Sequence, residues 1–273
     1  MGNRSSWTMV PAEITGRLRV GALKQSTLQE ARICVGARLL FCYPPHMEKI
    51  LAKVTNPRLR AMLLLCQEMV PGFNIQFKER SVFMKALYYC GFVWLFNPTF
   101  LTRYWTTTGK TVYAPTEAGF YADPEAAVNV LAHELVHMVD RKKNGHLGHD
   151  LPYAFPQILA VLSLFSIGAI WSLWFLFFLV FLLALAPIPS PGRKNVEMRG
   201  YTMSMACLWW RHGVMGDADF DWFAKQFSGP AYYFMWPFHK SATAELKLRF
   251  EAVKTGQILL DPVFQRVYTI LKG

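Results

Sequence analysis

The strongest hydrophobic pattern in this chain is an uncharged stretch from Leu151 to Gly192. Within it, Ile158 to Ala186 is almost unbroken Leu, Phe, Ile, Val, Ala and Trp, and three prolines close the stretch. As a single α-helix this inner segment would extend roughly 43 Å at about 1.5 Å per residue, more than a ~30 Å hydrocarbon core requires. We therefore expect it to turn back around Gly168 as a hydrophobic hairpin, to form two tilted half-spans, or to lie in the plane of a membrane.

Positive charge flanks this stretch on both sides. Arg141, Lys142 and Lys143 precede it, and Arg193 and Lys194 follow it. Because the cytoplasmic ends of membrane segments are enriched in Lys and Arg, we expect both ends to face the cytoplasm. This predicts membrane association through residues 151–192, with the rest of the chain on the cytoplasmic side. The alternative is an apolar insert that is buried within the protein or an oligomer and contacts no lipid.

The other hydrophobic patterns predict a mostly helical chain with a little β-structure. Apolar residues recur at helical spacing from about Pro11 to Met69, whereas the apolar segment from Asn74 to Phe96 fits either a buried helix or strands. Thr102 to Ala114 has β-branched and aromatic residues on both sides of Thr108-Gly109-Lys110, which predicts a β-hairpin. Further helices are expected at about Asn195–Arg211, Ala242–Lys254 and Pro262–Leu271.

A well-marked helix is expected directly after this β-hairpin. Asp123 is a suitable N-cap, Pro124 suits the first helical position, and Glu125 places an acid in the first turn. We expect the helix to run to about Lys142 and to stop at Asn144-Gly145.

This helix carries the sequence His133-Glu134-Leu135-Val136-His137, an H-E-x-x-H pattern. Residues four apart lie on one face of a helix, so His133 and His137 can bind one Zn²⁺. Glu134 can then take a proton from a water molecule as it attacks a polarised carbonyl group. Asp140 lies on the same face and is a candidate to accept the second ring N–H of a ligating histidine, or to be a solvated acid that pairs with Arg141 or Lys143.

A catalytic zinc usually takes three protein ligands, and the sequence offers two candidates for the third. Glu197 lies on the helix after the apolar stretch, which is the gluzincin arrangement, and Tyr201 follows it by one turn. His146 or His149 is the alternative, with a spacing that resembles the Spartan-type proteases. If Glu197 is the ligand, the apolar stretch must return to the side of the membrane that it left, because a single crossing would separate Glu197 from His133.

In these motifs the chain resembles the membrane-embedded zincins of the CAAX-prenyl-protease and HtpX heat-shock-protease group. The run from His133 to Asp140, continuing to Tyr153-Ala154-Phe155-Pro156-Gln157, is also similar to small uncharacterised metallopeptidase-like proteins of bacteriophage genomes. The resemblance covers about residues 102–205. It implies zinc, the ligands His133, His137 and Glu197, and Glu134 as the base. The chain departs from the membrane group in its shorter apolar segment and in having Tyr201 where an Asp is usual.

The expected fold is therefore α+β and mostly helical, with an inserted hydrophobic helical hairpin. Residues 1–100 would form a mostly helical N-terminal region, and residues 101–150 a zincin-like core with the β-hairpin and the motif helix. Residues 151–192 would be the hydrophobic hairpin, and residues 193–273 the Glu197 helix with the C-terminal helices.

Composition narrows the choice of partners. The chain has 53% hydrophobic residues and a formal net charge of +11, but no long run of Lys or Arg. This favours a membrane surface over nucleic acid as the partner of the positive charge. The five cysteines are widely spaced and include no C-x-x-C, which argues against a disulfide scaffold and against a cysteine zinc site.

The function that these features predict is a zinc-dependent metalloendopeptidase with a polypeptide substrate. Tyr201 is the expected catalytic partner of Glu134, and Tyr232, Tyr233 and His212 are further candidates to stabilise an oxyanion. The alternative is a structural or membrane-penetrating protein, such as a phage virion or genome-delivery component, with a zincin-like fold. A third and weaker hypothesis is a nucleic-acid-associated protease.

Overall fold

The computed structural model describes residues 45–90, 93, 97–229 and 234–273. The described part is mostly helical and has one three-stranded sheet, in agreement with the predicted α+β class. Tyr232, Tyr233, Cys34 and Cys42, and the helical pattern expected from Pro11 up to residue 44, lie outside the described residues.

The small sheet has the strand order β1-β3-β2. β3 (Thr111–Ala114) pairs antiparallel with β2 (Thr106–Thr108) and parallel with β1 (Asn74–Phe77). The β2–β3 pair confirms the predicted β-hairpin, and Gly109 in its turn has a φ of 64°, a conformation that favours glycine. The sequence from Asn74 to Phe96 fits either a helix or strands, and the structure has both: β1 is followed by the helix α4 (Val82–Cys90).

The motif helix α7 (Pro124–Ala154) packs between the N-terminal helices and α8. Its N-cap is Asp123, as expected, whose side chain accepts the Ala126 N–H. The prediction that the helix ends at Asn144-Gly145 is wrong, because the helix continues beyond this point. Gly145 does break the helix, with φ 73° and ψ 170°, but the chain resumes helical geometry and continues to Ala154. The break therefore adds a second helical segment, residues 146–154, which the sequence reading did not anticipate.

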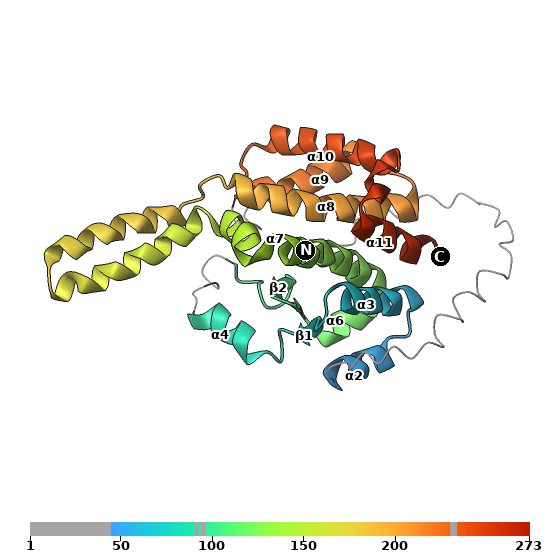
Figure 1. Cartoon of the computed structure of the whole chain (residues 1–273), viewed down its shortest axis with the longest axis horizontal. Coiled ribbons are helices and arrows are strands. Elements are labelled where there is room, and N and C mark those ends of the chain that lie inside the picture. Colours follow the sequence, from blue (N-terminus) through green and yellow to red (C-terminus); the bar gives the residue numbers. More distant parts are fainter. Residues whose placement is uncertain (1–44, 91–92, 94–96, 230–233) are drawn as a thin grey trace, which may run out of the picture.

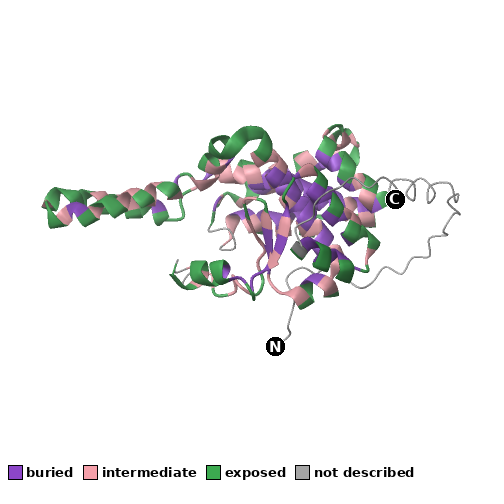
Figure 2. Cartoon of the chain, turned by 60° about the horizontal axis from the view of Figure 1, so that its bottom comes forward, coloured by how far each residue is buried: buried purple, intermediate pink, exposed green. Residues whose placement is uncertain are grey.

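Helix α8 (Pro191–His212) lies between α7 and α10 (His239–Lys254), as Figure 1 shows. It starts at its N-cap Ser190, earlier than expected, because Pro191 occupies its first turn. The remaining helices are α2 (Pro45–Lys53), α3 (Pro57–Met69), α6 (Glu117–Ala122), α9 (Asp217–Ser228), η4 (Gln257–Leu260) and α11 (Pro262–Lys272). Their apolar faces and the sheet form one core, seen as the buried centre of the body in Figure 2.

The apolar stretch forms a hairpin of two 3-10 helices, η1 (Gln157–Ile170) and η2 (Leu173–Leu185), which pack against each other. The chain turns back at Trp171-Ser172, and Gly168 lies so close to the Phe175 ring that a Cβ there would be 2.6 Å from it. Figures 1 and 2 show the hairpin projecting from the body, with much of its surface exposed. Among the described residues, no single helix is both long and apolar enough to cross a membrane. α7 and η1, bent by 81° at their junction, are long and apolar enough only when taken together.

Candidate metal centre

Three side chains from α7 and α8 converge to form a group that could hold a metal ion. His133 and His137 lie on one face of α7, and Glu197 faces them from α8. Glu197 Oε2 lies 3.4 Å from His133 Nε2 and 3.6 Å from His137 Nε2. One ligand atom from each residue can be chosen so that all three lie within 4.8 Å of one another. The structure thus brings together the two motif histidines and the glutamate that the sequence favoured as the third ligand.

The residues of this group fit a metal ion in two further ways. Glu197 Oε2 and both ring nitrogens of His137 are buried and have no hydrogen-bond partner, which is costly unless something else satisfies them. Gly200 leaves the space that the histidines need. A Cβ at this position would lie 2.6 Å from His133 Nε2 and 2.7 Å from His137 Nε2.

The electrostatics of the group favour a charged carboxylate. Burial alone would raise the pKa of Glu197, but the two histidine rings, 3.4 and 3.6 Å from its Oε2, outweigh burial and lower it. Burial acts to lower the pKa of His137, yet the close contact with the negative Glu197 carboxylate raises it overall. A cation held between the rings would take the place of these protons, since a metal binds neutral histidine and ionised glutamate.

Hydrogen bonds on the outer side of the ligands fix their orientation. His133 Nδ1 lies 3.1 Å from Ser204 Oγ, so a proton on Nδ1 leaves Nε2 for a metal. The Tyr153 hydroxyl donates to Glu197 Oε1 at 2.9 Å. The sequence reading missed both partners, because neither Ser204 nor Tyr153 stands in a recognisable motif with the ligand that it contacts.

Asp140, the predicted partner of a histidine ring, pairs with an arginine of α8 in the structure. Its Oδ2 lies 2.8 Å from Arg199 Nε on α8, and the same Arg199 hydrogen-bonds Asp261 through Nη2 at 2.7 Å. The packing of α8 against α7 brings this guanidinium to the Asp140 carboxylate. Burial raises the pKa of Asp140, and the charge of Arg199 opposes the rise.

Tyr201, expected to be catalytic, lies in the hydrophobic core. It is 2% exposed and packs edge-on against the His133 ring at 4.9 Å between centroids. Phe223 and Phe227 of α9 contact its ring as well. Tyr201 lies one helical turn after Glu197 and faces α9 rather than solvent. Its ring therefore packs against the His133 ring from the core side.

The alternative third ligands lie on the helical segment after Gly145. His146 is exposed, and its Nδ1 lies 3.3 Å from Asp150 Oδ2. His149 is buried, and its Nδ1 lies 3.1 Å from Asp150 Oδ1. His149 lies near the group without belonging to it, its ring being 6.4 Å from that of His137, and its Nε2 has no hydrogen-bond partner.

A cleft of about 440 Å³ opens beside the ligands. Its walls come from the β2 strand and turn, from α7 on both sides of Gly145, and from the start of α8. The lining residues include Thr106, Thr107, Thr108, Gly109, Glu134, His137, Arg141, His149, Asp150, Tyr153, Val196 and Glu197. Glu134, the predicted base, thus lies in the same cleft as two of the ligands. His212, another candidate, lies at a different pocket at the end of α8.

A buried lysine that has no place in any sequence motif lies close enough to Glu134 to be affected by its charge. Lys78 directly follows β1, is fully buried, and donates from Nζ to the Phe100 carbonyl at 2.9 Å. Its ammonium also lies 3.6 Å from the centre of the Phe100 ring. Burial lowers the pKa of Lys78 to about 7, and the negative charge of Glu134 opposes this lowering.

Comparison with known proteins adds no relative to this description. No family model matches the chain, and neither a curated protein nor a solved structure was found that matches it. The case for the site therefore rests on the residues and their geometry: two histidines and a glutamate arranged so that they could hold a metal ion.

Proposed function

We propose that this chain is a zinc-dependent metalloendopeptidase. The observation that carries the proposal is the convergence of His133, His137 and Glu197 beside a cleft that Glu134 also lines. Two imidazoles and one carboxylate are a usual ligand set of a catalytic zinc, which keeps a fourth position open. The zincin-like core, with Glu197 on the helix that follows the motif helix, is part of this proposal.

The chemistry divides between the ion and the side chains of the cleft. Zinc, when bound, would supply a Lewis acid that polarises a carbonyl group and makes water more acidic. Glu134 would accept the proton of the attacking water and pass it to the departing amine. His149 would stabilise the developing oxyanion in its imidazolium form: Asp150 would accept the Nδ1–H, and Nε2–H, which has no other partner, would donate to the oxyanion beside the cleft.

The shape of the cleft supports a peptide substrate. β2 is an edge strand of the sheet, and Thr106, Thr107 and Thr108 line the cleft beside Glu134. An extended peptide could add to this edge through main-chain hydrogen bonds, which would carry its backbone past the ligands.

The hydrophobic hairpin supports association with a membrane. Its large apolar side chains are strongly exposed, among them Trp174 at 87% and Trp171 at 80%, and it carries no charge. At a rise of roughly 2 Å per residue, 3-10 helices of 14 and 13 residues extend about 26–28 Å, close to a ~30 Å hydrocarbon core. Trp171 and Trp174 at the turn would then reach the far interface, where tryptophan is enriched. Both ends of the hairpin would emerge on one side, which we propose is the cytoplasmic one.

Two variants test the proposed function. Purified protein should contain about one zinc per chain, and His133→Ala should lose it. Glu134→Gln should keep the zinc and lose cleavage of an unfolded protein such as casein, because only the proton acceptor changes. A wild-type chain that binds no zinc, or a Glu134→Gln variant that cleaves as fast as wild type, would refute the proposal.

The exposed hairpin also supports a second candidate function, a structural or membrane-penetrating role of the kind found in phage virion or genome-delivery proteins. In that case the hairpin would be the working part, and Glu134→Gln would be silent. Deleting residues 158–186 separates the two candidates. An enzyme with a dispensable anchor retains some peptidase activity in solution, whereas a penetration protein loses its effect on membranes.

A further inference from the structure

The neck of the hydrophobic hairpin, residues 152–155 and 190–193, is joined directly to Glu197, the third residue of the metal group. Tyr153 lies in the last turn of α7, two residues before the helix ends at its C-cap Phe155. Its hydroxyl donates to Glu197 Oε1 at 2.9 Å, while Glu197 Oε2 faces the two histidines. A change in the position of this turn would therefore move the hydrogen-bond donor that orients the ligand carboxylate.

Three contacts lock the two sides of the neck together at the level of Tyr153. Ser190 Oγ donates to the Phe155 carbonyl at 2.5 Å, which joins the start of the hairpin to its end. Arg193 Nε donates to the Tyr153 carbonyl at 3.1 Å, and its guanidinium lies 5.1 Å from the Tyr153 ring centre. Gly192 packs so closely that a Cβ there would be 2.2 Å from the Pro152 carbonyl oxygen. The neck can therefore transmit the orientation of the hairpin to Tyr153.

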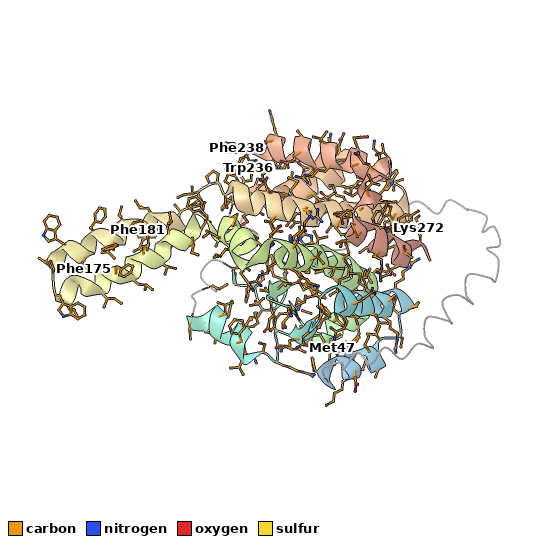
Figure 3. All side chains as sticks on the ribbon, viewed as in Figure 1. Met47, Phe175, Phe181, Trp236, Phe238 and Lys272 are labelled. Carbon is orange, nitrogen blue, oxygen red and sulfur yellow. The ribbon has the colours of Figure 1, made fainter. Side chains whose placement is uncertain are left out.

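The hairpin itself has the surface of a segment that binds lipid. Its exposed side chains are large and apolar, and Figure 3 shows aromatic side chains, Phe175 and Phe181 among them, along the arm that projects from the body. At the base of the arm Arg193 is bonded to the Tyr153 carbonyl and Lys194 pairs with Glu245 at 2.8 Å, so the case for a lipid partner rests on the apolar side chains of the arm. A bilayer would hold the arm in one orientation relative to the neck.

We propose that insertion of the hairpin into a bilayer and binding of the metal ion are coupled through Tyr153, so that each strengthens the other. This inference rests on the proposed function, because it requires both the metal site and the membrane contact. Tyr153 is a positioning residue: it acts on the metal through Glu197. Such coupling is reciprocal, so a bilayer that raises metal affinity implies a metal that raises bilayer affinity.

The expected effects have known scales. Loss of a hydrogen-bond partner of a metal ligand typically lowers metal affinity by about 10- to 100-fold. Tyr153→Phe should therefore weaken zinc binding by about 10-fold or more. Coupling between two sites is usually worth about 5- to 150-fold in affinity. Vesicles should accordingly raise the zinc affinity of the wild type by about 10-fold and that of Tyr153→Phe by much less.

The test measures zinc affinity of the full chain by competition with a chromophoric chelator. Each protein is measured alone and with vesicles of phosphatidylcholine and phosphatidylglycerol, and flotation of the vesicles reports binding. Tyr121→Phe is the matched control, because it removes a buried hydroxyl that has no hydrogen-bond partner. Leu173→Glu should abolish both vesicle binding and the gain in zinc affinity. Leu260→Glu, at a residue that is 85% exposed on η4, should abolish neither.

The outcomes separate this inference from the proposed function. Zinc binding that vesicles strengthen in the wild type and in Tyr121→Phe, but not in Tyr153→Phe, supports the coupling. Zinc binding and proteolysis that are intact but indifferent to vesicles overturn the coupling alone, as does an equal vesicle effect in both tyrosine variants. A chain that self-associates through the hairpin but does not float with the vesicles overturns the proposal that the hairpin inserts into a bilayer. A wild type that binds no zinc under any condition overturns the proposed function, and the coupling with it.

Discussion

Gly200→Ala is the substitution that most sharply tests the packing of the metal group. The added Cβ would lie 2.6 Å from His133 Nε2, 2.7 Å from His133 Cε1 and 2.7 Å from His137 Nε2, whereas ordinary contacts begin at 3.4 Å. At least one ring must retreat by roughly 0.8 Å, several times the ~0.2 Å latitude of a zinc–ligand distance. The methyl group would therefore remove one imidazole from the metal.

The size of the effect follows from the share that one ligand contributes. Structural zinc sites bind with about 10–16 kcal/mol across four ligands, or roughly 3 kcal/mol each. Gly200→Ala should then weaken zinc binding by about 100-fold or more. The fold should survive, because alanine favours the helix over glycine by up to about 1 kcal/mol, which offsets part of the overpacking.

The assay is zinc affinity by chelator competition, with thermal unfolding measured on the same samples. Gly148→Ala is the matched control. Gly148 is also a helical glycine, in α7, and an added Cβ would lie at an ordinary 3.5 Å from Asn144 Cβ. It should bind zinc as the wild type does. A Gly200→Ala protein that is folded and binds zinc with wild-type affinity would refute the geometry of the site.

Two further predictions concern groups around the metal centre. Ser204→Ala should weaken zinc binding by roughly 10-fold, because His133 Nδ1 loses the oxygen that fixes its tautomer; unchanged affinity would show that Ser204 has no such role. Lys78 is buried with a pKa of about 7, so above that pH the unfolded chain binds more protons than the folded one. The free energy of unfolding should therefore rise with pH from about 7 towards the ordinary lysine pKa of 10.5, by up to about 1.4 kcal/mol per unit, and urea titrations of Lys78→Met should lack this rise. An identical slope in both proteins would contradict the assignment.

The ligands that follow a local rule could be predicted from the sequence. His133 and His137 are four residues apart on a helix whose start is marked by Asp123 and Pro124, so helical geometry alone brings their rings together. Glu197 required a tertiary argument, that the hydrophobic stretch returns to the side that it left. Its convergence with the histidines agrees with that argument.

What the sequence did not reveal depends on contacts between distant segments. Tyr153 and Ser204 reach the ligands because α7 packs against α8, and the buried Lys78 is held by the carbonyl and ring of Phe100. Gly145 was read as the end of a helix, because a glycine with positive φ usually ends one. Here helical geometry resumes after the break, which carries His149 and Tyr153 back towards the metal group. Local helix propensity predicts neither the resumed helix nor the return of these two side chains to the metal group.

Anomalous diffraction at the zinc absorption edge, on crystals of the full chain grown with zinc, tests the central claim most directly. One strong peak about 2 Å from His133 Nε2, His137 Nε2 and a Glu197 carboxylate oxygen is the result that the account predicts. A peak that is ligated by His149 or His146 in place of Glu197, or the lack of any peak between α7 and α8, would contradict it.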